Sequence, residues 1–162
     1  MADVFDDKLN RSHEVLMKDK VLSEHIDVPP GRRFIGFDGY RKAMDAMDPG
    51  DIAILTTPCA FRWPMFEYAV EKGLNVFMEK PVTADGYASR KILEINEKAK
   101  EKGLKIGIGL MCRHCKSRNE LKKRIDDGEI GDITFMRSYR MQGAIGSCFT
   151  PKNDTDMSEL MY

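Results

Sequence analysis

Three groups of side chains in the sequence could bind and activate a small polar molecule. The first is Thr56-Thr57-Pro58, whose hydroxyls and backbone turn can bind a ribose or an amide. The second is Glu79-Lys80-Pro81, in which the lysine can donate to a substrate hydroxyl or carbonyl while its neighbours tune its pKa. The third is the basic pair Arg113 and His114. Each group alone is typical of a solvated turn, but together they favour a site if the fold brings them to one place.

A short apolar run precedes each group and predicts a buried parallel strand, covered on both faces. The runs are Ile52-Ala-Ile-Leu55, Val76-Phe-Met78 and Ile106-Gly-Ile-Gly-Leu110. Between them we expect one helix from about Pro64 to Gly73 and a second capped by Asp85 and ended by Gly103. Alternating strands and helices with short connections predict right-handed βαβ crossovers in a parallel sheet. Ligands of such sheets bind outside the carboxyl ends of the strands, where the three groups would meet.

The flanking segments give weaker patterns. We expect helices over residues 7–25 and 40–47, and a short strand at Phe34-Ile35. A further helix contains Leu121 and Ile125 and is closed by Gly128; after it, residues 133–139 alternate between two unlike faces. This period of two predicts a strand of a different, antiparallel sheet. The fold class is therefore α/β, with a candidate domain boundary near Ile130-Gly131.

Composition narrows the class of protein. The 162 residues suit one ordinary domain or a piece of a larger protein, and 26 Lys and Arg residues balance 26 Asp and Glu residues. A zero balance argues against nucleic acid or an anionic membrane surface as a partner, because either needs a surplus of positive charge. No apolar run approaches the ~20 residues of a membrane span, and the first residues lack a signal peptide. We expect a cytoplasmic protein, unless a longer amino terminus carries an export signal.

The four cysteines leave a metal or redox site open as a minor alternative. Cys112-Arg-His-Cys115 has the spacing of a zinc or redox motif, but a zinc ion would need two further ligands. Only Cys59, Cys148, His13 and His25 remain as thiolate or imidazole donors, and they form no second pair of fitting spacing. We therefore expect no metal site.

Three segments carry a resemblance to a known family: Asp51-Ile-Ala-Ile-Leu-Thr-Thr-Pro58, Gly73-Leu-Asn-Val-Phe-Met-Glu-Lys-Pro81 and Gly128-Glu-Ile-Gly-Asp-Ile133. With them the sequence resembles the Gfo/Idh/MocA family of NAD(P)-dependent oxidoreductases, from residue 1 to about residue 146. The resemblance implies a Rossmann-like doubly wound parallel sheet followed by the first strand of an α+β domain. It also implies dehydrogenase or reductase activity on a sugar, a cyclitol or a related polyol, and a homo-oligomeric parent protein.

The resemblance assigns roles to the three groups. Lys80 is implied to be catalytic and to contact both substrate and nicotinamide, and Glu79 is implied to orient it and to border the cofactor. Pro81 would turn the chain there, in similar proteins often through a cis peptide. The stretch Thr56-Thr57-Pro58 is similar to cofactor-contacting residues of the family. Arg113 would then contact the cofactor and His114 the substrate.

The resemblance also favours NAD over NADP as the cofactor. Asp3 falls where the second strand of the family fold ends, and an acidic side chain there binds the ribose hydroxyls of the adenosine. Its carboxylate would repel the 2′-phosphate of NADP.

The sequence departs from the family in ways that predict a fragment. It has no Gly-x-Gly-x-x-Gly turn after an early strand, and Gly107-Ile-Gly109 lies in a late one. No histidine follows His114, although the second domain of the family usually supplies one as acid or base. Arg62 and Asn75 stand where similar proteins often carry histidine.

These departures lead to two expectations. Residues 1–128 would form a partial dinucleotide-binding domain without its central strand, and 129–162 the start of a substrate and oligomerisation domain. Such a sheet would expose unpaired edges, and the chain alone would be inactive. The alternative is a non-enzymatic nucleotide-binding or regulatory module on the same scaffold.

Overall fold

The computed structural model describes residues 1–139, 141 and 143. The chain divides into two compact units, Met1–Cys115 and Lys116–Tyr162. All the side chains that the sequence nominates for catalysis or for binding cofactor or substrate lie in the first unit.

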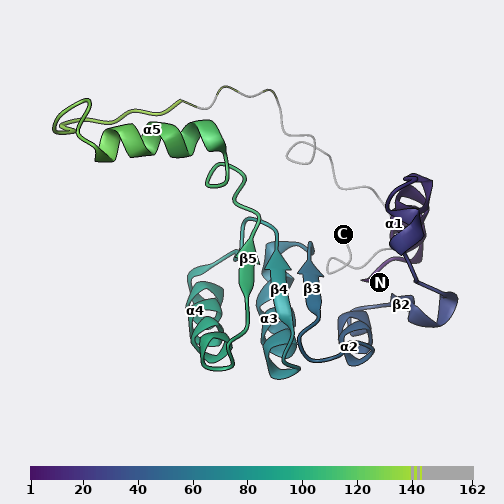
Figure 1. The fold of residues 1–162 in the computed structure, drawn as a ribbon. Helices are drawn as coiled ribbons and strands as arrows, with labels where there is room; N and C mark the ends of the chain where they lie inside the picture. Colours follow the sequence, from purple (N-terminus) through teal and green to yellow (C-terminus); the bar gives the residue numbers. More distant parts are fainter. Residues whose placement is uncertain (140, 142, 144–162) are drawn as a thin grey trace. The chain divides into compact units, whose positions relative to one another are not determined.

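Two parallel sheets form the strand framework of the first unit (Figure 1). One pairs β1 (Ala2–Asp3) with β2 (Phe34–Ile35). The other has the order β3-β4-β5, made of β3 (Ile52–Leu55), β4 (Asn75–Met78) and β5 (Ile106–Ile108). The three parallel strands predicted from the apolar runs are confirmed, and the strand at 34–35 is confirmed as well.

Four α-helices and three single turns of 3-10 helix connect these strands. The helices are α1 (Asp6–Lys18), α2 (Gly39–Asp45), α3 (Arg62–Glu71) and α4 (Gly86–Glu101); the turns are η1 (Ser23–His25), η2 (Pro30–Arg32) and η3 (Cys59–Phe61). The predicted cap of α4 is confirmed, since Asp85 Oδ1 accepts the Ala88 amide at 2.7 Å. Gly73 and Gly103 follow α3 and α4 at φ of 74° and 70°, the left-handed conformation that ends a helix most readily at glycine.

The helix predicted over residues 7–25 is too long. Asp19 ends α1, because its Oδ1 accepts the amides of Val21 and Leu22 at 2.9 Å each, and these amides then take no part in helical hydrogen bonding. The chain continues through the separate turn Ser23–His25.

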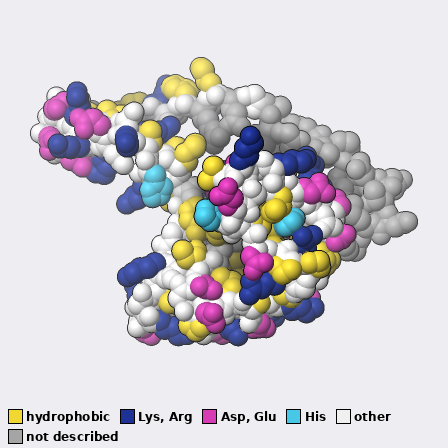
Figure 2. Space-filling model, turned by 45° about the vertical axis from the view of Figure 1, so that its right-hand side comes forward, with side chains coloured by type: hydrophobic (Ala, Val, Ile, Leu, Met, Phe, Trp, Pro, Cys, Tyr) yellow, Lys and Arg dark blue, Asp and Glu magenta, His cyan; other side chains and the backbone are white. Residues whose placement is uncertain are grey.

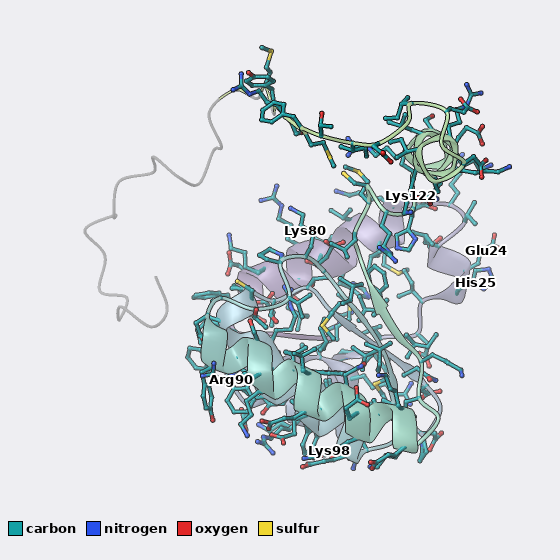
Figure 3. The ribbon with its side chains drawn as sticks, turned by 90° about the vertical axis from the view of Figure 1, so that its left-hand side faces the viewer. Glu24, His25, Lys80, Arg90, Lys98 and Lys122 are labelled. Atoms are coloured by element: carbon teal, nitrogen blue, oxygen red, sulfur yellow. The ribbon has the colours of Figure 1, made fainter. Side chains whose placement is uncertain are left out.

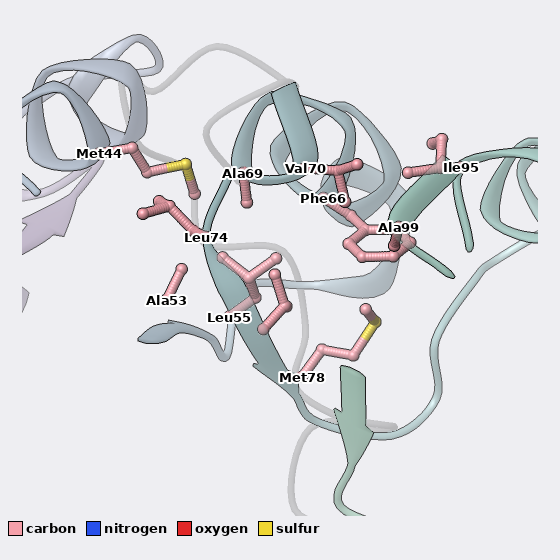
Figure 4. Packing of buried hydrophobic residues seen from close by; sticks show 11 residues of the cluster. Met44, Ala53, Leu55, Phe66, Ala69, Val70, Leu74, Met78, Ile95 and Ala99 are labelled. Atoms are coloured by element: carbon pink, nitrogen blue, oxygen red, sulfur yellow. The ribbon is translucent and has the colours of Figure 1, made fainter. Parts of the chain in front are cut away.

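The core lies between β3-β4-β5 and the helices α3 and α4 (Figure 4). Phe66 of α3 is completely buried at its centre. The buried cluster consists of Met44, Ala53, Leu55, Phe66, Ala69, Val70, Leu74, Val76, Met78, Ile95 and Ala99. These residues fix the sheet against its two helices.

Only one face of this sheet is buried by the described residues. Burial alternates along β3, so that Ala53 and Leu55 point into the core while Ile52 and Ile54 remain 63% and 67% exposed. The expectation of cover on both faces is therefore not met in the described part of the chain. The physical reason is that α3 and α4 both supply side chains to the same buried cluster.

An exposed polar contact joins α2 to α3. The Tyr68 hydroxyl donates to Asp45 Oδ1 at 2.7 Å, and Lys72 Nζ lies 2.8 Å from the same oxygen. The hydrogen bond from Lys72, followed by that from Tyr68, holds the pKa of Asp45 below its ordinary value. This contact stays charged at neutral pH, when the Asp45 carboxylate is ionised.

Charged side chains of both signs are interspersed over the face shown in Figure 2, in keeping with the balanced composition. Among the residues that the structure describes, no helix combines the length and the apolar character needed to cross a bilayer.

The second unit contains the helix α5 (Lys116–Asp126), and Gly128 follows it at φ of 82°. The helix and its glycine terminator agree with the sequence pattern. The strand predicted over residues 133–139 is not formed: these residues have no assigned strand, and Phe135 is 74% exposed. A strand exists only when a second strand satisfies its backbone groups, and no such partner occurs in the described ranges.

Candidate active site

The carboxyl ends of β3, β4 and β5 lie side by side. In the strand register Leu55 is opposite Met78, and Met78 is opposite Ile108. The ladder continues one step further, because the Glu79 amide donates to Leu55 O at 3.0 Å and the Gly109 amide to Met78 O at 2.9 Å. The residues that follow the three strands therefore start from one edge of one sheet.

A buried arginine connects the loops that follow β3 and β4. Arg62, the first residue of α3, is only 2% exposed. Its Nη1 donates to the carbonyl oxygens of Glu79 and Pro81, and its Nη2 donates to Thr57 O. One guanidinium thus holds both predicted cofactor loops.

In the sequence Arg62 stands out only as a departure from the family pattern, which does not predict this contact. One signal could have found it. A cation in the first turn of a helix opposes the helix dipole, and here it stands between Phe61 and Trp63, in an apolar context. Such a residue needs hydrogen-bond partners outside its own helix.

The Glu79 side chain lies against the backbone at the end of β5. A Cβ atom on Gly109 would come within 2.7 Å of Glu79 Oε1 and 3.0 Å of Oε2. The glycine therefore makes room for the carboxylate, as expected from the glycines of this strand. Glu79 Oε2 accepts the Lys80 backbone amide at 3.1 Å, so its contact with Lys80 is to the main chain.

Replacing Gly109 with alanine is expected to displace the Glu79 carboxylate and to break its bond to the Lys80 amide. Because the displaced group is the end of a flexible side chain, we expect a stability loss of only about 1 kcal/mol, the lower end for overpacking. The Lys80 amide shift in a 15N–1H NMR spectrum and a urea titration would measure both effects.

Gly107→Ala is the matched control, since a Cβ there meets only Phe77 Cδ2 at an ordinary 3.4 Å. If the Lys80 amide moved equally in the two variants, the close packing of Glu79 on Gly109 would not be the cause.

Lys80 is exposed at the end of β4, above helix α4 in the view of Figure 3. The peptide bond from Lys80 to Pro81 is cis, as the resemblance implied. The ammonium of Lys80 forms no ion pair with any of the described residues. The side chain is therefore available to a ligand at this edge of the sheet.

Thr56 and Thr57 border a cavity of about 400 Å³, whose lining also includes Met1 and Ala2 and all of β3. Thr57 is half-buried and its hydroxyl lies 3.4 Å from Met65 Sδ, whereas Thr56 and Pro58 are exposed. Residues of both sheets line the cavity, and the two sheets are not hydrogen-bonded to each other. It is large enough for part of a small ligand.

Asp3 ends β1 in the other sheet of this unit. Its Oδ1 accepts the Phe5 amide at 2.9 Å, and the second carboxylate oxygen accepts no hydrogen bond from the described residues. Asp3 is not hydrogen-bonded to the group around Glu79 and Arg62.

Arg113 and His114 lie in a turn after β5. Their amides donate to Leu110 O at 2.8 Å and to Met111 O at 3.2 Å, and both side chains are exposed. In the described part of the chain neither side chain is hydrogen-bonded to Glu79 or Lys80. The structure therefore brings Thr57, Glu79, Lys80 and Pro81 together through Arg62 but does not tie the basic pair to them.

The cysteines of the same turn do not form a metal site with the described residues. Cys112 is exposed and Cys115 half-buried, both as free thiols. No group of three or more His, Cys, Asp or Glu side chains in the described ranges is arranged to hold a metal ion. Cys148, the other cysteine considered for zinc, lies outside the described residues.

Comparison with known proteins gives relatives that are named as inositol dehydrogenases or as sugar 3-reductases. No protein-family model matches the chain. The chain is 28% identical over 117 residues to inositol 2-dehydrogenase of Corynebacterium glutamicum, covering 71% of this chain and 34% of that protein. It is 37% identical over 99 residues to scyllo-inositol 2-dehydrogenase (NAD(+)) of Bacillus subtilis, covering 60% and 28%.

The solved structures agree with the sequence relatives. The fold matches scyllo-inositol dehydrogenase from Lactobacillus casei with bound NAD(H) and scyllo-inositol, at a TM-score of 0.59 and 25% identity. That match covers 82% of this chain and 34% of the other. The chain spans about a third of the length of the curated relatives it matches.

Proposed function

We infer that this chain, a relative of the Gfo/Idh/MocA oxidoreductases, carries the lysine side of a nicotinamide-dependent active site for a cyclitol, a sugar or a related polyol. One observation carries the proposal. Lys80 is exposed at the carboxyl end of β4, in a loop that Arg62 ties to the Thr57 loop. This is the edge of a parallel sheet at which ligands bind.

The residues of this edge suit a dehydrogenase. NAD would supply the hydride acceptor when bound. The Lys80 ammonium would donate to the reacting oxygen of the substrate and hold it, while Glu79 fixes the Lys80 main chain through its amide. The hydroxyls of Thr56 and Thr57 would bind the cofactor beside the cavity, with Pro58 shaping the turn. Arg113 would contact the cofactor and His114 the substrate from the turn after β5.

Asp3 supports NAD rather than NADP as the cofactor. Its Oδ1 is used by the Phe5 amide, which leaves the second oxygen for a ribose hydroxyl. A 2′-phosphate near this carboxylate would be repelled.

The fit to the dinucleotide is partial. Hydroxyl, carboxylate and ammonium groups suit its two ribose ends, but the sequence has no glycine-rich turn to cradle the pyrophosphate. We therefore propose that the 162-residue chain by itself binds NAD weakly and turns over no substrate.

The chain also divides, by prediction, into two regions with different roles. We propose that residues 1–128 serve the cofactor and that 129–162 begin a substrate and oligomerisation region of a homo-oligomeric protein. Residues 129–162 extend into the part of the chain that the structure does not describe.

Titrating the chain with NAD is expected to shift the amides of Thr57 and Lys80 with a dissociation constant on the order of 1 mM, because the pyrophosphate contacts are lacking. The amides of Asn75 and Lys105, at the opposite ends of β4 and β5, should not move. NADP should bind more weakly than NAD. The measurement is 15N–1H NMR, with absorbance at 340 nm recording any reduction of NAD by myo- or scyllo-inositol.

Two outcomes would contradict these expectations. Micromolar NAD binding or measurable turnover by the chain alone would contradict the proposed weakness and inactivity. Shifts at Asn75 and Lys105 without shifts at Thr57 and Lys80 would contradict the location of the site.

A further inference from the structure

Arg62 is the one charged or polar side chain that is buried among the described residues. It has no carboxylate within ion-pair distance in the described ranges, and its Nε is buried without a hydrogen-bond partner. Its two terminal nitrogens serve three carbonyls, of Thr57, Glu79 and Pro81. All three carbonyls belong to the loops proposed to hold cofactor and substrate.

Such a residue is costly as a packing element. Removing a charge from water costs several kcal/mol, and carbonyl dipoles compensate it less fully than a carboxylate does. An apolar side chain at position 62 would not carry this cost, if the three carbonyls had other partners. The guanidinium is therefore best explained by the geometry that it imposes on the two loops.

We propose that Arg62 is a positioning residue that sets the spacing between the main chain of the Thr57 loop and the main chain from which Lys80 projects. The planar guanidinium presents two nitrogens in fixed directions, so Nη2 holds the β3 loop while Nη1 holds the β4 loop on both sides of Lys80. The Lys80 side chain remains exposed, while the main chain on both sides of it is held. This inference rests on the proposed function of the Lys80 edge.

The variant Arg62→Lys distinguishes the effect of the guanidinium geometry from the effect of the positive charge. The lysine ammonium keeps the positive charge and three donors but presents them from a single atom, so it cannot hold both loops at the guanidinium spacing. Methionine removes the charge and the donors together and leaves three buried carbonyls unpaired, so Arg62→Met could lose the fold. Arg62→Lys is for that reason the main variant, and Arg90→Lys on the exposed face of α4 is its matched control.

The test combines NMR, thermal unfolding and NAD titration of the whole 162-residue chain. In Arg62→Lys we expect the amides attached to the accepting carbonyls, of Lys80 and Val82, to shift while those of Val70 and Ile95 in the core do not. The melting temperature should fall by a few degrees. The affinity for NAD, measured from the amide shifts of Thr57 and Lys80, should fall about 10-fold, because a hydrogen bond from a charged donor is misplaced. A residue that only stabilises the fold would lower stability and leave NAD affinity of the folded fraction unchanged.

Each outcome decides the proposal. The positioning role would be overturned if the Lys80 and Val82 amides of Arg62→Lys kept their wild-type chemical shifts. It would also be overturned if these amides shifted but the affinity for NAD stayed unchanged. Failure of the wild-type chain to respond to NAD would instead refute the proposed function, and with it the positioning role that rests on it. Arg90→Lys should match the wild type in every measurement.

Discussion

Replacing Phe66 with alanine is expected to lower the free energy of unfolding by about 3–5 kcal/mol, the usual cost of removing a buried aromatic ring. Phe66 is 0% exposed and lies among side chains from α3, α4 and the sheet β3-β4-β5. The ring cannot be replaced by neighbours, because the surrounding cluster is fixed by strands on one side and a second helix on the other. A domain of this size has a total stability of about 5–15 kcal/mol, so much of the population could unfold.

Urea unfolding followed by circular dichroism would measure the loss. Leu93→Ala is the matched control, because Leu93 lies on α4 but is 65% exposed, and its truncation should cost less than about 0.5 kcal/mol. Equal effects of Phe66→Ala and Leu93→Ala would mean that Phe66 does not occupy the centre of the core.

Replacing Lys80 with methionine is expected to weaken NAD binding by about 10- to 100-fold, the loss of a hydrogen bond from a charged donor. Methionine keeps most of the aliphatic length of lysine and removes only the ammonium. Because Lys80 is exposed and forms no ion pair with the described residues, its loss should leave the melting temperature unchanged. The NAD-induced amide shift at Thr57 measures the effect from a neighbouring loop.

Lys105→Met is the control for this experiment. Lys105 is also exposed, but it precedes β5 and lies at the opposite end of the sheet from Lys80. If both variants bound NAD like the wild type, Lys80 would not contact the cofactor.

The central strands and helices could be predicted from the sequence because each carries its own local signal. The apolar runs at 52–55 and 76–78 are bounded by residues that end a strand, and Asp85 caps its helix with its own side chain. The apolar pattern predicts that the third strand ends at Leu110, two residues later than β5 ends in the structure. The Leu110 amide donates to Ile108 O at 2.7 Å within a turn. The apolar pattern does not reveal this turn.

The parts that failed depend on contacts between distant segments. A period of two at 133–139 predicts a strand only if a partner strand exists, and the described residues provide none. The role of Arg62 depends on carbonyls 17 and 19 residues away, at Glu79 and Pro81. The position of Lys80 at the sheet edge was predictable, since it follows from where β4 ends. The main-chain contact of Glu79 was not, because it depends on the rotamer of one side chain.

The separation of the strands into two sheets has a consequence for native-state dynamics. The β1-β2 pair has two residue pairs in register, whereas β3-β4-β5 has four and three and is covered by the main core. Local opening requires less free energy where fewer buried contacts must be broken. Hydrogen–deuterium exchange should therefore reveal two foldons, with Asp3 in the one that opens first and Lys80 anchored to the one that opens last. For the dinucleotide site proposed above, this means that the region around Asp3 would unfold and bind the adenosine end less often, while the region around Lys80 stays folded.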